Sequence, residues 1–353
     1  MMWLNSFNYF RALAILSIVA NHSLPISGWQ IDTAGERFFA NLVIGGSTLF
    51  VFISGFLFHH VHYPRFSYLP FLQRKFRNIF IPYLFLSIPP IIYFVFFKTW
   101  APHQELFFTG QPDLYHAYLR PILMYLATGS VIASFWYIPF IMTVFVFSPL
   151  LVAFIKWRPA ARITTVVLLL IHALFVQCPV GNLLVPQWVA YHLPTFLLGI
   201  VVSIHRDFFY RLLHAREGYL LLLTLLFAWL QARYYPGYGS LHKAFFQPAL
   251  PDVQMLQKIC LSFFLIIYLH RYESSSFTPL AVMAETSFAI YFLHSFVLYG
   301  MERLFGLLPV SSEWMQGPVL WLVLTVLVTL ACMGLARVCR SVLRSHSRLL
   351  IGY

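Results

Sequence analysis

The stretch FNYFRALAILSIVANHS, Phe7–Ser23, decides the fold, because it predicts a membrane-spanning helix that nevertheless carries charge. A charged side chain at the centre of a bilayer costs roughly 3 kcal/mol on insertion scales, so it is expected only where it faces something polar. Arg11 and His22 are eleven residues apart, which on a helix of 3.6 residues per turn places them on one face, about 16 Å apart along the axis. Asn8 lies one turn before Arg11 on the same face. We therefore expect one polar stripe that faces protein or a water-filled cavity.

The composition extends this prediction to the whole chain. Of 353 residues, 60% are hydrophobic and 10% are charged, and the mean hydropathy is +0.76. Soluble domains carry about 25% charged residues. The net charge of +12 is spread over short loops, which indicates topology and contact with membrane lipids rather than nucleic acid. The cysteines are scattered and predict neither a disulfide framework nor a zinc site: Cys178, Cys260, Cys332 and Cys339.

A transmembrane helix needs about 20 mostly apolar residues, and ten segments meet that requirement. They are Phe7–Gly28, Phe38–Phe58, Asn78–Phe97, Ser134–Ile155, Ile163–Cys178, Gln187–Ile204, Gly218–Tyr234, Met255–His270, Pro279–Tyr299 and Pro318–Val338. Leu119–Ile132 is apolar but short, so we interpret it as an interfacial or re-entrant segment. The fold class predicted is therefore an all-α, polytopic integral membrane protein with about ten transmembrane helices.

Basic residues predict the orientation of these helices. If the N-terminus is inside, the outside loops contain only Arg37, Lys98, Arg120, Arg233, Lys243, Lys258 and Arg303, and the other 16 of the 23 Lys and Arg residues lie inside. The positive-inside rule then places both termini in the cytoplasm. We expect one membrane domain over residues 1–341 and a short basic cytoplasmic tail over residues 342–353. With no cleavable signal peptide evident, the predicted location is a bacterial inner (cytoplasmic) membrane.

Two groups of polar residues are candidates for chemistry. His22 could act as a general base, because neutral imidazole can take a proton from an alcohol near pH 7, or it could be an interfacial histidine bonded to a loop carbonyl. Arg74 and Arg77 share a face if a helix begins there, and Lys75 adds a third charge. Arginine pairs suit bidentate phosphate binding, but they also fit an ordinary basic flank that reaches the lipid headgroups.

Other polar residues fall within the predicted helices. His172 and His192 lie in the fifth and sixth, and Glu285, the only carboxylate placed inside a span, is expected to be functional or paired with a basic residue. Glu285 is nine residues from His294, half a turn out of phase, so the two are not expected to act as one pair.

Trp136 fits an aromatic belt or a site wall. His59, His60 and His62 lack a ligand pattern, and no metal site is predicted.

Five motifs in order resemble acyltransferase family 3, the integral-membrane acyltransferases that modify surface sugars and some lipids. FNYFRALAILSIVANHS is similar to the family's opening, an Arg followed by a His eleven residues later. The other four are FVFISGFLF with Ser54 in its Ser-Gly-Phe, RKFRNIFIPYLF with its R-x-x-R, SFWYIPFI, and SFAIYFLH ending at His294. The resemblance covers nearly the whole chain.

Two departures from the family pattern stand out. The family often has an acidic residue just before the Leu-Arg of its opening, where this chain has Asn8, Tyr9 and Phe10, so an ion pair of Arg11 is not assumed. Phe288 stands where the family commonly has Tyr, so a hydroxyl is missing there.

The resemblance implies an O-acetyltransferase whose donor is acetyl-CoA from the cytoplasm. Arg74, Arg77 and Lys75 would meet the nucleotide phosphates, and the pantetheine arm would run past Arg11 towards His22. His22 would deprotonate an acceptor hydroxyl or carry the acetyl group itself. The implied acceptor is a surface or cell-envelope glycan, or a lipid-linked sugar.

Two other functions remain open from the sequence. One is a transporter or flippase of an acyl group or a lipid-linked sugar, against which stand the absence of an inverted repeat and of paired Gly/Pro-broken helices. The other is a membrane scaffold without chemistry, which would tend to avoid polar groups inside its helices.

Overall fold

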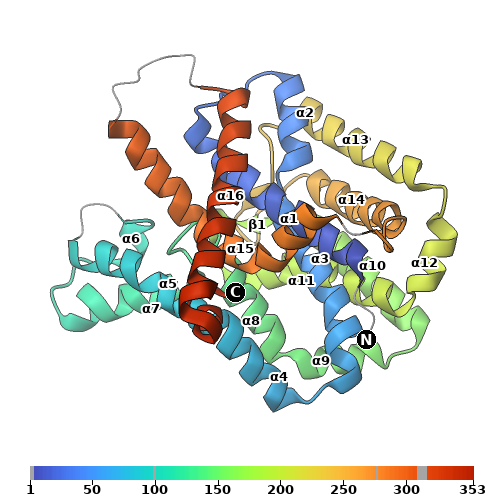
Figure 1. The fold of residues 1–353 in the computed structure, drawn as a ribbon, viewed down its shortest axis with the longest axis horizontal. Coiled ribbons are helices and arrows are strands. Elements are labelled where there is room, and N and C mark those ends of the chain that lie inside the picture. Colours follow the sequence, from blue (N-terminus) through green and yellow to red (C-terminus); the bar gives the residue numbers. More distant parts are fainter. Residues whose placement is uncertain (1–3, 98–100, 276, 308–315) are drawn as a thin grey trace.

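The computed structural model describes residues 4–97, 101–275, 277–307 and 316–353, with the side chains of residues 305–307 excluded. Lys98, counted above among the outside cations, lies outside the described residues. The described chain is almost entirely helical (Figure 1). Its two strands, β1 (Cys178–Pro179) and β2 (His242–Lys243), are two residues long and pair in parallel.

The helices follow the apolar segments of the sequence. They are α1 (Asn5–Ser23), α2 (Ala34–Val43), α3 (Gly46–Leu57), α4 (Tyr68–Lys75), α5 (Ile81–Ile92), α6 (Gln104–Phe107), α7 (Arg120–Thr128), α8 (Tyr137–Val146), α9 (Ser148–Ile155), α10 (Pro159–Val176), α11 (Val185–Ile204), α12 (Arg206–Leu213), α13 (Glu217–Tyr234), α14 (Val253–His270), α15 (Thr278–Leu307), α16 (Pro318–Leu343) and α17 (Ser347–Ile351). Three π-helical turns, η2 (Phe58–His62), η4 (Phe76–Phe80) and η5 (Tyr93–Phe97), continue α3, α4 and α5.

The expected number of ten spans is not confirmed. Within the described residues, seven helical segments are long and apolar enough to cross a membrane, or up to nine if each of two bent pairs is one span. These nine correspond to nine of the ten expected segments, and the tenth is α1. It packs against α3, α14, α15 and α16 in the middle of the bundle (Figure 1). Because protein surrounds α1, its polar stripe does not need to face lipid.

Several helices are interrupted. α8 and α9 meet at a bend of 61°, and α12 and α13 at 87°. α2 and α3 are separated at Gly45, whose φ of 95° is left-handed and favours glycine. The carbonyl oxygens that α2 leaves unpaired at its end accept hydrogen bonds from buried Lys258, whose Nζ lies 3.2 Å from Asn41 O and 2.8 Å from Leu42 O.

This position of Lys258 corrects the count of outside cations. Lys258 lies inside α14 with no solvent exposure, so it is not a loop charge. Gln254, one turn earlier on α14, donates to Ile44 O at 2.9 Å. Together the two side chains of α14 fix the break between α2 and α3 and therefore the start of α3.

α3 and α11 cross in backbone contact. A Cβ added to Gly55 would lie 1.9 Å from the carbonyl oxygen of Phe196, and one added to Gly199 would lie 2.2 Å from that of Phe52. Only glycine fits at either point. The crossing holds the start of α3 and the first half of α11 beside the cavities described below.

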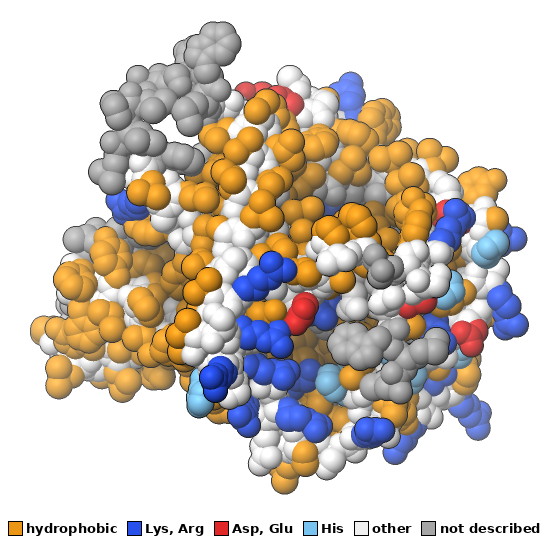
Figure 2. Space-filling view, in the orientation of Figure 1, with side chains coloured by type: hydrophobic (Ala, Val, Ile, Leu, Met, Phe, Trp, Pro, Cys, Tyr) orange, Lys and Arg blue, Asp and Glu red, His pale blue; other side chains and the backbone are white. Residues whose placement is uncertain are grey.

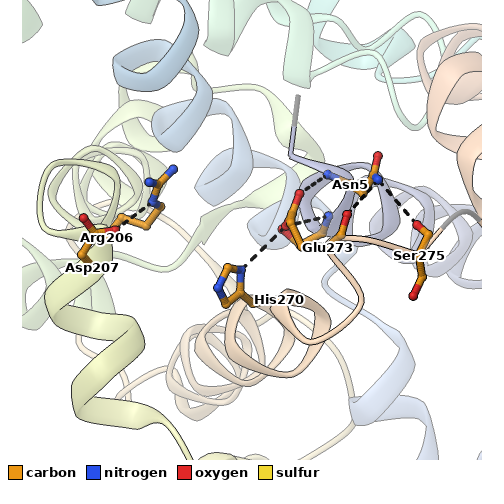
Figure 3. A network of polar contacts seen from close by, with 7 residues as sticks. Asn5, Arg206, Asp207, His270, Glu273 and Ser275 are labelled. Atoms are coloured by element: carbon orange, nitrogen blue, oxygen red, sulfur yellow. Dashed lines mark hydrogen bonds and ion pairs between the residues drawn. The ribbon is translucent and has the colours of Figure 1, made fainter. Parts of the chain in front are cut away.

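The N-terminus of α1 is held by the segment after α14. The carboxylate of Glu273 accepts from the backbone N–H of Asn5 at 2.5 Å and of Ser6 at 3.3 Å, and the Asn5 amide donates to Glu273 O at 2.9 Å (Figure 3). His270 Nδ1 lies 3.7 Å from the same carboxylate. A negative charge on the first free N–H groups stabilises a helix start, so α1 enters the bundle in a fixed position.

The C-terminal residues, expected as a short basic tail, fold back onto the bundle. α17 packs against α5, η4 and α16, and Ile351 is buried. The C-terminus lies in the lower half of the view in Figure 1. Figure 2 shows Lys and Arg side chains gathered in that lower half, with hydrophobic side chains above and to the left.

Candidate active site

Two cavities meet at His22. The smaller has a volume of about 190 Å³ and is lined by the second half of α1, the start of α3 and residues of α8, α11 and α15. The larger, of about 1100 Å³, is lined by α5, η5, the loop before α8 and the second half of α15. His22, Ala133 and Asn182 line both. The His22 side chain is therefore accessible from two separate spaces, each of which can hold a different molecule.

His294 of α15 is the neighbour of His22. Their ring centroids are 5.2 Å apart. His294 Nδ1 lies 2.9 Å from the carbonyl oxygen of Ile290, which can only accept, so Nδ1 carries the proton. Its Nε2 is left to accept from Ser295 Oγ, at 3.3 Å. These bonds fix the tautomer and the orientation of the ring beside His22. Sequence reasoning kept His294 as a candidate but did not pair it with His22.

Arg11 lies on the same side of α1, two turns into the helix. Its Nη2 donates to Ser287 Oγ on α15 at 2.7 Å. Among the described residues no carboxylate forms an ion pair with it. Arg11 is therefore held by a neutral hydroxyl, and its charge remains available to an anion. Ser287 is followed by Phe288, which lines the smaller cavity.

Ser54 reaches the site through a neighbour. It does not line either cavity, but its Oγ lies 3.0 Å from the hydroxyl of Tyr137, which lines the smaller one. Tyr291, also on that wall, donates to Ser134 O at 2.5 Å. These bonds connect α3, α8 and α15 around the cavity, so Ser54 positions Tyr137.

Trp136 lies in the wall of the smaller cavity and is 8% exposed. Its ring stacks on Trp188 with centroids 3.6 Å apart and an interplanar angle of 13°, and it lies 5.4 Å from His192 at 11°. Trp136 is therefore buried in a cavity wall rather than exposed at the surface. Sequence reasoning missed Trp188. The available signal was its spacing of four residues from His192, which puts both on one face of α11.

Glu285 lies away from both cavities. Its carboxylate accepts from Arg340 Nη1 at 2.7 Å, and 56% of the side chain is exposed. Of the two expectations for Glu285, the structure shows the one in which it pairs with a basic residue, and that residue is Arg340. Glu285 is on the opposite side of α15 from His294, as the half-turn spacing predicts.

None of the two cavities' lining residues is Arg74, Lys75 or Arg77. Arg74 and Arg77 are exposed. Lys75 Nζ lies 3.0 Å from His62 Nε2 and over the rings of Phe71 and Phe145. The π-helical turn η4 begins directly after Lys75 and displaces the backbone relative to an α-helix. Arg74 and Arg77 are thus surface cations, whereas Lys75 is half-buried and directed towards His62. The described part of the chain contains no group of three or more His, Cys, Asp or Glu residues arranged to hold a metal ion.

The helices and the internal, histidine-lined cavities define the class: this is a multi-pass helical membrane protein with a buried polar site. Residues 4–337 match the family model described as an acyltransferase domain, that of acyltransferase family 3. The match covers nearly the whole chain, and the protein belongs to this family of membrane acyltransferases. No curated protein and no solved structure was found to match it.

Proposed function

We propose that the protein is an O-acetyltransferase that takes an acetyl group from cytoplasmic acetyl-CoA. It transfers this group to a hydroxyl of a cell-envelope polysaccharide or lipid-linked sugar at the outer side of a bacterial inner membrane. The observation that carries the proposal is the position of His22, where two cavities meet at one end of a stripe that begins at Arg11. An acyltransferase needs two substrates to meet at one nucleophile or base, and the position of His22 between two cavities supports this role.

The proposed binding of the donor, acetyl-CoA, rests on the charge of nearby side chains. CoA carries phosphates that suit guanidinium and ammonium groups. Arg74 and Arg77 supply these on the surface, the half-buried Lys75 lies beside them, and Arg11 supplies a further cation inside the bundle. The distance from Arg11 to His22 along α1, about 16 Å, suits the long and thin pantetheine arm.

At His22 two chemical routes remain. In direct transfer, the neutral imidazole takes the proton of the acceptor hydroxyl while the oxygen attacks the thioester carbonyl. The carbon–sulfur bond then breaks, and the thiolate of CoA receives a proton. In the second route, the imidazole nitrogen attacks the thioester carbonyl, the carbon–sulfur bond breaks, and CoA leaves as a thiol that takes the imidazole proton. The acceptor hydroxyl then attacks the acetyl-imidazole, the carbon–nitrogen bond breaks, and the hydroxyl proton passes to the imidazole. His294, whose ring orientation is fixed by Ile290 and Ser295, supports the His22 ring in either route.

A transporter or flippase is the second candidate, and one observation favours it. The bent pair α8–α9 and the break between α2 and α3 resemble the discontinuous helices that line transport pathways. Cleavage of the thioester separates the two functions, because a transporter without chemistry leaves acetyl-CoA intact.

The experiment compares wild type with His22→Ala in membranes of the native host. O-acetyl groups on purified surface glycans are read by mass spectrometry, and acetyl-CoA cleavage is followed in the purified proteins. His172→Ala is the matched control, since His172 is an exposed histidine on α10. We expect His22→Ala to insert normally and to lose acetylation, as removal of a general base lowers rates by about 10²–10⁴-fold. A wild type that never cleaves acetyl-CoA would refute the proposed function, and full activity of His22→Ala would refute the role of His22.

A further inference from the structure

Three aromatic rings, stacked on one another, form one wall of the smaller cavity. Trp136, Trp188 and His192 lie nearly parallel, with interplanar angles of 7° to 13° between them. All three line the cavity and are at most 8% exposed. Trp136 and Trp188 cover one face of each other, with ring centroids 3.6 Å apart, so a ligand can stack only on an outer face of this group. Such an aromatic face binds a ligand that has an apolar face of its own.

Three polar atoms of this wall have no hydrogen-bond partner among the described residues. Neither ring nitrogen of His192 nor Nε1 of Trp188 has a hydrogen-bond partner among the described residues, although each atom is buried. Leaving such a group unpaired costs about 1–3 kcal/mol relative to pairing it. Buried polar atoms in native proteins nearly always pair with protein, ordered water or a ligand, so these three atoms can hydrogen-bond to a water or ligand molecule in the cavity.

The remaining lining shows what kind of molecule fits. Besides histidines, its polar side chains are neutral hydroxyls and amides: Asn21, Ser47, Ser134, Tyr137, Asn182, Ser240 and Tyr291. No Lys, Arg, Asp or Glu is among the lining residues. A phosphate or carboxylate would meet no cation there. An acyl chain would leave the polar atoms of the wall unpaired. A neutral ring with several hydroxyl groups and one apolar face satisfies both the wall and the polar residues.

We propose that the smaller cavity is the binding pocket for one sugar ring of the acceptor, with Trp136, Trp188 and His192 as residues that determine specificity. This inference deepens the proposed function and rests on it for the identity of the acceptor. A hydroxyl of a ring held there faces His22, which lines the same cavity. The rest of a glycan occupies the larger cavity, which shares His22, Ala133 and Asn182 with the smaller one.

Binding of simple glycosides tests the pocket without any turnover. The full chain, purified in detergent, is titrated with methyl β-D-glucopyranoside, methyl β-D-galactopyranoside, methyl N-acetyl-β-D-glucosaminide and methyl α-L-rhamnopyranoside, with intrinsic tryptophan fluorescence as the readout. Acetyl-CoA binding is measured in parallel. The variants are His192→Phe, which keeps a flat ring and removes both nitrogens, and Trp188→Phe, which removes the indole N–H. His172→Phe is the control on exposed surface.

We expect at least one glycoside to bind saturably. His192→Phe should weaken its binding about tenfold and Trp188→Phe several-fold, since each loses hydrogen bonds to the ring. His172→Phe and all acetyl-CoA affinities should stay unchanged. If no glycoside binds, or if both wall variants bind it as wild type does, the inference is wrong. If acetyl-CoA affinity falls instead, the pocket belongs to the donor, and the inference is also wrong. If glycoside binding behaves as expected but wild type never cleaves acetyl-CoA, the proposed function fails while the sugar pocket stands.

Discussion

The crossing of α3 and α11 gives the most quantitative prediction. Gly55→Ala places a Cβ 1.9 Å from the carbonyl oxygen and 2.7 Å from the carbonyl carbon of Phe196. Real Cβ atoms essentially never approach another atom closer than 3.0 Å, so the two backbones must separate by about 1.1 Å. The obstacle is backbone and not the end of a flexible side chain. No change of rotamer can therefore relieve the clash.

The size of the effect follows from two opposing contributions. Overpacking of this kind costs about 1–3 kcal/mol, and the upper end applies because a whole helix must move and lose contacts along its length. Replacing Gly by Ala inside a helix stabilises the folded state by about 1 kcal/mol, because Ala loses less backbone entropy on folding. The net destabilisation expected is about 2 kcal/mol, which for a chain of this size lowers the melting temperature by roughly 3–6 °C.

The measurement is the thermal unfolding midpoint of the purified protein in detergent, together with acetyl-CoA cleavage. Activity should fall too, because α3 carries Gly46, Ser47 and Phe50 of the smaller cavity. Gly334→Ala on α16 is the control, since a Cβ there meets no atom within 4 Å and should leave stability equal or slightly higher. If Gly55→Ala melts with wild type or with Gly334→Ala, the close crossing of α3 and α11 is not a feature of the native protein.

Two further predictions concern residues outside the cavities. Glu285→Gln breaks the exposed pair with Arg340, so melting temperature and activity should both stay near wild type, and a large loss of turnover would show a catalytic role for Glu285. Partial burial and the nearby Arg162 guanidinium lower the pKa of His205, which lies between α11 and α12. A histidine pKa below its unfolded value of about 6.5 means that the unfolded chain binds the proton more readily, so stability falls as pH drops through that range. We therefore expect His205→Gln to reduce the loss of melting temperature between pH 7.5 and 5.5; an equal loss in both proteins would contradict this.

Much of the site could be predicted from sequence because it depends on local geometry. The rise and twist of an α-helix alone put Arg11 and His22 on one side of α1, and alone put Glu285 and His294 on different sides of α15. The interruptions of the helices were harder to foresee. The break at Gly45 depends on Lys258 and Gln254, which are more than 200 residues away in the chain.

By itself, the sequence determined the class of protein and which apolar segments form helices. Its hydropathy required helices packed in a membrane, and its motifs placed it in a family of acyltransferases. Only the tertiary structure decided which faces of different helices pack against each other. The contact of His22 with His294, the bond of Arg11 to Ser287 and the wall of Trp136, Trp188 and His192 each join helices that are distant along the chain. Such contacts follow from how side chains of separate helices interlock, and no periodicity within one helix specifies that.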